Sequence, residues 1–215
     1  MFAGYLARSD RAQPVFWPMR VMQSYGPKAT TRWPISCAAA ATMRQVESSA
    51  RLSRGCMLRE SKPAPNLVPL AQWFEELEPA AAAQGGVLAL SAGAARDLLA
   101  SQREVAVLHG DIHHGNILDF GERGWLAIDP KGLVGDRGFD YANLFCNPDQ
   151  ATATAPGRLA RRIEVVADAA GLERKRLLRW ILAWAGLSAA WHLADGTSPK
   201  TALAVGEIAA AQLSL

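Results

Sequence analysis

The pattern of apolar residues in this 215-residue chain changes abruptly near Pro63. Before that point, prolines at positions 14, 18, 27 and 34 interrupt every candidate element, and the apolar residues follow neither the helix nor the strand period. Residues 1–60 hold nine Lys and Arg against three acids, a net charge of +6, whereas the other 14 basic and 17 acidic residues give −3. We therefore predict an irregular, poorly ordered segment over residues 1–60 and a folded unit over residues 61–215.

Helical periodicity dominates the second unit. Apolar residues recur at helical spacing from Leu67 to Leu77, and Ser91 is a plausible N-cap for a second helix that runs through Leu99. Four more helices are expected, over residues 139–145, 158–170, 173–194 and 202–213.

One short β region interrupts these helices. Residues 105–108 read as a buried strand, and residues 116–120 and 124–128 flank a Gly-Glu-Arg turn, a pattern typical of a hairpin. The predicted fold class is therefore α+β, with helices arranged around a small β-hairpin.

The composition argues against several classes of protein. A net charge of +3 is too small to indicate nucleic-acid binding, and the isolated Cys37, Cys56 and Cys146 favour neither a zinc site nor a disulfide framework. The N-terminus has no apolar run of signal-peptide length, and the stretch from Trp180 to Trp191 is too short to span a bilayer. We expect a cytoplasmic protein with neither a membrane nor a nucleic acid as partner.

The segment from His109 to Asp129 contains residue types that phosphoryl transfer to a hydroxyl requires. That reaction needs a carboxylate to accept the hydroxyl's proton and oxygen ligands to hold magnesium against the nucleotide phosphates. Asp111 and Asn116 are five residues apart, as in the kinase catalytic loop, and Asp129 ends the strand that returns beside that loop. The spacing indicates a kinase-type site.

The same segment resembles the aminoglycoside phosphotransferase superfamily. HGDIHHGNIL followed by WLAIDP is similar to the H-G-D-x-x-x-x-N and I-D signatures of that superfamily, and GLVGDRGFDYANLF is similar to the streptomycin 6-kinases and the hydroxyurea-type antibiotic resistance kinases. The resemblance runs from about Lys62 to the C-terminus. It implies a protein-kinase-like C-terminal helical lobe and an enzyme that transfers the γ-phosphate of ATP, with Mg²⁺, to a hydroxyl of an aminoglycoside such as streptomycin, which inactivates the antibiotic.

Position by position, the resemblance assigns a role to each motif residue. Asp111 is the implied catalytic base, and Asn116 and Asp129 are the implied magnesium ligands. His109 supports the loop of the cofactor site, to which Asn116 also belongs. Because streptomycin carries guanidinium cations, Asp136 and Asp140 are candidates for complementary negative charge.

Two other interpretations of the motif remain open. Asp119-Phe120-Gly121 spells the protein-kinase D-F-G, but its place in the hairpin turn favours Asp129 as the metal ligand. His113 and His114 are adjacent loop residues, which makes loop packing a better interpretation than metal ligation.

The resemblance also implies an upstream lobe that this sequence largely lacks. Family members carry there a β-sheet with a lysine that contacts the nucleotide phosphates, and residues 1–60 contain no V-x-K strand. One choice of codons for residues 42–58 encodes an amphipathic helix in a shifted reading frame. One hypothesis is therefore that residues 1 to about 58 are an out-of-frame translation. The alternatives to an active aminoglycoside kinase are a truncated, catalytically silent remnant and a kinase of another small alcohol.

Overall fold

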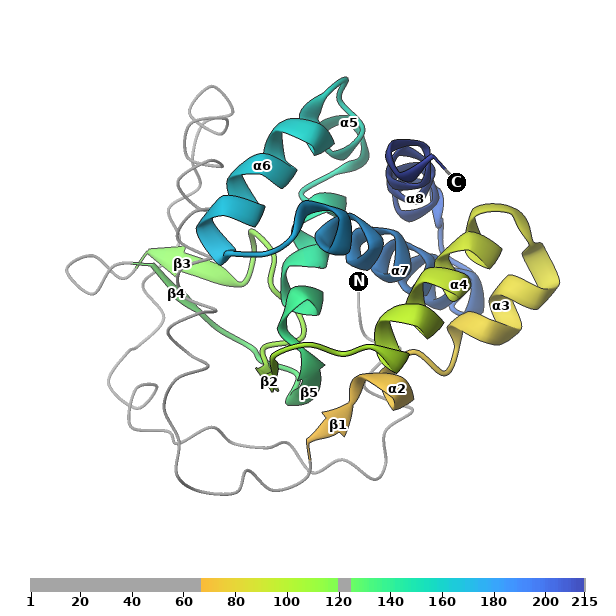
Figure 1. Cartoon of the computed structure of the whole chain (residues 1–215). Helices are drawn as coiled ribbons and strands as arrows, with labels where there is room; N and C mark the ends of the chain where they lie inside the picture. The colour runs from red at the N-terminus through yellow and green to blue at the C-terminus, as the bar shows by residue number, and fades with distance from the viewer. Residues whose placement is uncertain (1–66, 120–124, 215) are drawn as a thin grey trace.

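The computed structural model describes residues 67–119 and 125–214 (Figure 1). The predictions for residues 1–60, including the missing lobe and the shifted frame, lie outside the described residues. The elements in chain order are β1 (Val68–Pro69), α2 (Leu70–Trp73), α3 (Leu77–Gln84), α4 (Gly86–Ala100), β2 (Val105–Leu108), β3 (Ile117–Asp119), β4 (Trp125–Ala127), β5 (Leu133–Asp136), the 3₁₀ helix η4 (Arg137–Cys146), α5 (Gln150–Ala153), α6 (Arg158–Ala170), α7 (Arg174–Ala194) and α8 (Lys200–Leu213). This helix-rich arrangement with little sheet is consistent with the predicted α+β class.

Two small sheets lie on one side of the helices (Figure 1). The first has the order β1-β5-β2, with β5 parallel to β1 and antiparallel to β2. The second is the predicted hairpin, in which β3 pairs with β4. Within the first sheet Leu108 pairs with Leu133, so the residues that follow β2 lie beside the residues that precede β5. This register brings the start of the motif segment beside Lys131, whose backbone N–H donates a hydrogen bond to the His109 carbonyl oxygen at 2.7 Å.

The core of the helical part is built around α7. This helix packs against α3, α4, α6, α8 and η4, and Trp180 in its N-terminal half is fully buried. The Trp180 ring meets Phe139 of η4 edge to face, with ring centroids 5.8 Å apart, and lies 6.2 Å from the Phe74 ring. Burial of large aromatic side chains dominates core energetics, so this cluster fixes η4 against α7.

The prediction that Ser91 caps a helix is wrong. Helix α4 begins at Gly86, five residues earlier, and Ser91 is fully buried inside it. A Cβ on Gly186 of α7 would lie 2.2 Å from the Ser91 Cβ, so the two helices touch at this point. A small residue is needed here for close helix packing, which explains Ser91 better than capping does.

Two other elements differ from the sequence prediction. The first predicted helix is divided into β1, α2 and α3, and the chain after Pro130 forms strand β5 before any helix begins. Strand β5 depends on hydrogen bonds to β1 and β2, which are distant in the sequence. The helix predicted over residues 139–145 is present as part of η4, and Asp136 caps it by accepting a hydrogen bond from the Gly138 N–H at 2.8 Å.

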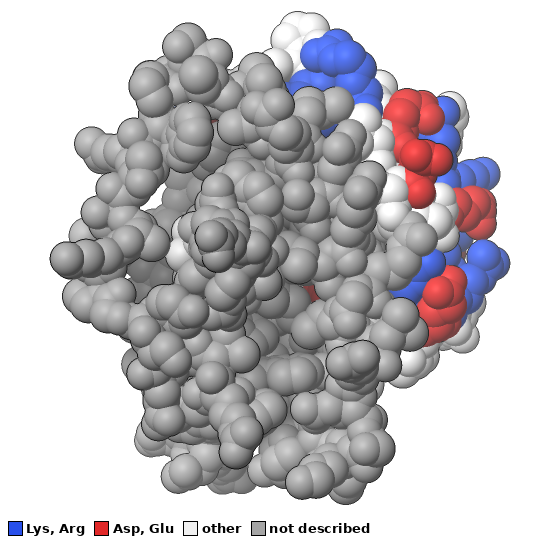
Figure 2. Space-filling view, turned by 90° about the vertical axis from the view of Figure 1, so that its left-hand side faces the viewer, with Lys and Arg blue, Asp and Glu red and all other residues white. Residues whose placement is uncertain are grey.

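The described part of the surface carries both basic and acidic side chains. Lys and Arg side chains lie among Asp and Glu side chains on the described part of the face shown in Figure 2. Exposed ion pairs such as Arg96–Glu78 and Arg103–Glu173 belong to this kind of surface. None of the helices within residues 67–119 and 125–214 is long and apolar enough to cross a membrane.

Candidate active site

The loop between β2 and β3 is held at its start by a carboxylate from η4. Asp140 accepts hydrogen bonds from the backbone N–H groups of His109, at 2.9 Å, and Gly110, at 2.7 Å. Gly110 has a φ of +82°, and a Cβ there would lie 2.8 Å from the Leu133 side chain. Only glycine suits this position, because the conformation is left-handed and the space is already filled.

His109 ties this loop to the end of β4. Its Nε2 lies 2.9 Å from the Ile128 carbonyl oxygen, and its Nδ1 is 3.3 Å from the Asp111 backbone N–H, which donates to it. The pair of contacts requires a neutral ring protonated at Nε2. Burial lowers the pKa of His109, which is consistent with that neutral form. Both ring nitrogens contact backbone groups, so His109 links the loop to the end of β4, and its place in the cofactor site stays a prediction.

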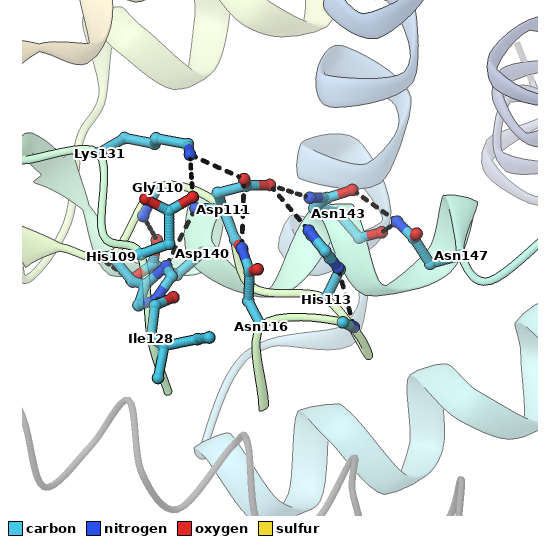
Figure 3. Close-up of polar contacts among 12 residues, drawn as sticks. His109, Gly110, Asp111, His113, Asn116, Ile128, Lys131, Asp140, Asn143 and Asn147 are labelled. Atoms are coloured by element: carbon cyan, nitrogen blue, oxygen red, sulfur yellow. Dashed lines mark hydrogen bonds and ion pairs between the residues drawn. The ribbon is translucent and has the colours of Figure 1, made fainter. Parts of the chain in front are cut away.

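Asp111 lies at the centre of a network of side-chain amides (Figure 3). Its Oδ1 accepts a hydrogen bond from Asn143 Nδ2 at 2.8 Å, and its Oδ2 accepts one from Asn116 Nδ2 at 3.3 Å. Asn116 Nδ2 also donates to the Asp111 carbonyl oxygen at 2.9 Å. Behind Asn143, Asn147 Nδ2 donates to Asn143 Oδ1 at 2.9 Å, which turns the Asn143 amide nitrogen toward Asp111. The Asp111 carboxylate is therefore held both by η4, through Asn143, and by its own loop, through Asn116.

Lys131 joins Asp111 to Asp129. Its Nζ is 2.7 Å from Asp129 Oδ2 and 3.3 Å from Asp111 Oδ2. Burial alone would lower the pKa of Lys131, but the hydrogen bond to Asp129 and the charge of Asp111 raise it, so the side chain is an ammonium. Asp129 has a φ of +60° and a side chain that is 67% exposed. Its carboxylate thus faces solvent beside the loop between β2 and β3.

The three residues that the sequence places at the site share one neighbourhood. Asp111 and Asn116 are in direct contact, and Asp129 is linked to Asp111 through the Lys131 ammonium. The D-F-G alternative falls partly outside the described residues, since Asp119 ends β3 and Phe120 and Gly121 are not described.

The two histidines of the loop have separate partners. His113 Nδ1 accepts a hydrogen bond from the Gly115 N–H at 3.0 Å, and its Nε2 lies 3.7 Å from Asp111 Oδ1. His114 Nε2 instead lies 3.4 Å from Nη2 of Arg162 on α6. These contacts place the two rings against different parts of the loop's surroundings.

The sequence interpretation missed Asn143, Asn147 and Lys131. Asn143 and Asn147 come from η4 and the residue after it, and their approach to Asp111 depends on tertiary structure. Two signals were available: Lys131 directly follows the I-D-P motif, and Asn143 lies three residues after Asp140.

Asp136 and Asp140, the candidates for negative charge complementary to a cationic acceptor, lie inside the protein. Both are buried, with 2% and 3% of their surface exposed. Asp136 accepts from the Arg103 backbone N–H at 2.9 Å and pairs with Arg176, while Asp140 holds the loop. Burial raises the pKa of Asp140 to about 6 despite its two backbone hydrogen bonds. These carboxylates organise the interior of the site.

The oxygens of Asp129 and Asn116 fit a magnesium ion in part. The described residues contain no group of three or more His, Cys, Asp or Glu side chains placed to hold a metal. Mg²⁺, however, is usually bound by one or two protein oxygens together with substrate phosphates and water. The exposed Asp129 carboxylate offers one such ligand, and Asn116 Oδ1 offers another because the Nδ2 of that amide faces Asp111.

Comparison with known proteins agrees with this geometry. Residues 37–196 match the model of the family described as aminoglycoside/hydroxyurea antibiotic resistance kinase. The chain is 56% identical over 141 residues to a streptomycin 3''-kinase from Klebsiella pneumoniae, covering 63% of this chain and 53% of that protein. It is 38% identical over 109 residues to a streptomycin 6-kinase from Streptomyces griseus, covering 49% of this chain and 34% of the relative.

A hydroxyurea phosphotransferase from Kitasatospora aureofaciens is 35% identical over 121 residues, covering 53% of this chain and 34% of that protein. The chain thus spans about half the length of the first of these relatives and about a third of the other two. The family match extends over most of the chain, from residue 37 to residue 196. The protein therefore belongs to the aminoglycoside/hydroxyurea antibiotic resistance kinase family.

Proposed function

We propose that this protein transfers the γ-phosphate of ATP to a hydroxyl of streptomycin or a closely similar aminoglycoside, and that residues 67–214 act as a kinase-like C-terminal lobe. The observation that carries the proposal is the Asp111 carboxylate, which Asn143 and Asn116 hold beside the Lys131–Asp129 pair. Such an arrangement suits phosphoryl transfer, in which positioning and charge neutralisation supply nearly all of the catalysis.

In this proposal Asp111 orients the acceptor hydroxyl and takes its proton. The hydroxyl oxygen attacks the γ-phosphorus in line, the bond between the γ-phosphorus and the bridging β–γ oxygen breaks, and ADP leaves with the bonding electrons. Asn143 and Asn116 keep the Asp111 carboxylate oriented during this step. Asp129 and Asn116 would hold Mg²⁺, which when bound neutralises charge on the nucleotide phosphates.

The acceptor position is the finer part of the proposal. Sequence motifs alone favoured the streptomycin 6-kinases, whereas the identity to the 3''-kinase is 56% against 38% to a 6-kinase. This difference supports the 3''-hydroxyl as the first position to test, with the 6-hydroxyl second.

The test uses the purified full chain with ATP, MgCl₂ and streptomycin. We expect phosphorylated streptomycin by mass spectrometry, with the modified hydroxyl assigned by ³¹P–¹H NMR, and we expect Asp111→Asn to lower kcat at least about a hundredfold. Asp168→Asn, an exposed acid on α6, is the matched control. Turnover that survives in Asp111→Asn would contradict the role of Asp111.

Two further outcomes separate the alternatives. Phosphorylation of another small alcohol, such as choline or homoserine, in place of streptomycin would favour a kinase of different specificity. Absence of turnover on every acceptor, together with streptomycin binding in calorimetry, would favour a catalytically silent relative that only binds the acceptor.

A further inference from the structure

Lys131 has a position that stability alone does not explain. Its side chain is 31% exposed and that of Asp129 is 67% exposed, and ion pairs at such sites contribute only about 0–1 kcal/mol. Yet Asp129 adopts a left-handed backbone conformation, with a φ of +60°, immediately before Pro130. Sparsely populated backbone conformations of this kind cluster at functional sites.

The ammonium lies between the two carboxylates that perform different tasks in the proposed reaction. It is 3.3 Å from Oδ2 of Asp111, the proposed base (Figure 3), and 2.7 Å from Oδ2 of Asp129, the proposed metal ligand. His113 approaches the opposite oxygen of Asp111, at 3.7 Å. Lys131 is thus a cation shared by both halves of the site.

The distances that phosphoryl transfer requires between the reacting atoms and Asp111 place the transferred phosphoryl group next to Lys131. The acceptor oxygen must lie within about 2.6–3.2 Å of the Asp111 carboxylate, and reacting atoms approach to about 3–3.5 Å before transfer. Since Nζ is 3.3 Å from the same carboxylate, the phosphoryl oxygens come within reach of a flexible lysine side chain. An ammonium there stabilises the negative charge on the phosphoryl oxygens.

We propose that Lys131 is a catalytic residue that exchanges partners. In the nucleotide-free protein it neutralises Asp129 and competes with metal for that carboxylate; when the nucleotide is bound it contacts the transferred phosphoryl group. This inference rests on the proposed function, but its first part concerns the protein without nucleotide and is tested separately.

The first experiment measures metal binding without turnover. Mn²⁺ binding to the nucleotide-free full chain is followed by electron paramagnetic resonance for the wild type, Lys131→Met and Lys131→Arg. We expect Lys131→Met to bind Mn²⁺ about threefold to tenfold more tightly, because a competing cation is removed, and Lys131→Arg to resemble the wild type. Equal or weaker binding in Lys131→Met overturns the proposal. An Asp129→Asn change made in Lys131→Met must abolish the gain, which locates the metal at Asp129.

The second experiment measures transfer. Lys131→Met is expected to lower kcat about tenfold to a thousandfold with little change in KM for streptomycin, because the contact forms only as the phosphoryl group is transferred. Lys131→Arg is expected to recover part of that loss, since it restores the charge. A kcat equal to that of the wild type in Lys131→Met overturns the proposal.

The two readouts distinguish the two proposals. Tighter Mn²⁺ binding in Lys131→Met, with no turnover even in the wild type, overturns the proposed function while supporting the competition at Asp129. Unchanged thermal unfolding of Lys131→Met serves as the folding control, as expected for a partly exposed pair.

Discussion

The two sides of the loop between β2 and β3 differ in how completely their polar groups are paired. On the Asp111 side, both carboxylate oxygens accept side-chain hydrogen bonds, and the loop N–H groups of His109 and Gly110 are held by Asp140. On the His114 side, Nδ1 of His114 is buried and has no hydrogen-bond partner among the described residues. The polar groups of this loop therefore have hydrogen-bond partners on the side of Asp111, whereas some of those on the side of α6 do not.

Arg162 of α6, which lies beside His114, is a buried charge with few hydrogen-bond partners among the described residues. It is 2% exposed, its Nε and Nη1 have no hydrogen-bond partner among the described residues, and its Cζ lies 5.7 Å from the centroid of the Phe145 ring. Burial and the nearby Arg158 lower the pKa of Arg162 to about 9, and burial together with Arg162 lowers that of His114 to about 3. The difference teaches that the polar groups around Asp111 are closely paired, whereas a buried charge is left with few partners on the α6 side of the loop.

The largest effect is expected where the paired side is broken. Asp140→Ala leaves the N–H groups of His109 and Gly110 without an acceptor, and each unsatisfied buried donor costs about 1–3 kcal/mol. We expect the free energy of unfolding to fall by about 2–4 kcal/mol in urea denaturation. Asp168→Ala, at an exposed position, should change it by less than about 0.5 kcal/mol. Equal effects of the two substitutions would refute the role of Asp140.

A smaller effect, on activity, is expected at Asn143. Asn143→Leu keeps the side-chain size but removes the donor to Asp111 Oδ1, so the carboxylate loses its orientation from η4. We expect kcat to fall about tenfold to a hundredfold. Asn147→Leu, which acts only through Asn143, should lower kcat less. Steady-state kinetics on streptomycin measure both, and an Asn143→Leu protein with the kcat of the wild type would contradict this reading of the network.

The unpaired side should respond in the opposite direction. Arg162→Met retains a long apolar side chain and removes a buried charge, and such replacements are often neutral or stabilising. We expect the free energy of unfolding to rise by about 1–2 kcal/mol. Arg161→Met, on the exposed side of the same helix, is the control and should stay within about 0.5 kcal/mol of the wild type. A loss of more than about 1 kcal/mol in Arg162→Met would show that Arg162 is compensated.

The smallest effect is a dependence of stability on pH that arises from His114. Its pKa is about 3 in the folded protein and 6.5 in the unfolded chain, so the unfolded chain binds the proton first as pH falls. The stabilisation is complete above pH 6.5 and is lost progressively toward pH 3, by about 1 kcal/mol between pH 6.5 and pH 5.5.

The matched variant for this pH dependence is His114→Gln, which does not titrate. Asp140 contributes in the opposite sense, because its pKa rises from 3.8 to about 6 on folding, so its ionisation lowers stability as pH rises through that range. That contribution is common to both proteins and cancels in their difference. Parallel stability curves for the wild type and His114→Gln between pH 7 and pH 5 would contradict the assignment.

The sequence correctly predicted those helices and strands whose periodicity, turn residues and caps lie within the segment itself. Strand β2, the β3–β4 hairpin, α6 and most of α7 match the predicted ranges, because period, turn residues and caps lie within each segment. Strand β5 was missed because its hydrogen bonds come from β1 and β2. The prediction of Ser91 as an N-cap is wrong because the position of Ser91 depends on a tertiary contact with Gly186 of α7, which the local sequence does not show.

The same division applies to the site. Asp111 and Asn116 could be found because they are five residues apart in one loop, and their contact is local. Asn143 reaches Asp111 only because η4 runs back past the loop, and this approach follows from the pairing of β2 with β5. No spacing within the motif itself encodes that contact.

The pairing of Leu108 with Leu133 also makes the lengths of two separate chain segments interdependent. The first two residues after Leu108, His109 and Gly110, donate backbone hydrogen bonds to Asp140, which lies seven residues after Leu133. These hydrogen bonds form only if both segments keep their present length. An insertion or deletion on either path would shift one partner past the other, and strand slippage by one residue would also turn Leu108 out of the core. Sequence length should thus vary freely among homologues in the β3–β4 turn, while these two spacers keep a constant number of residues.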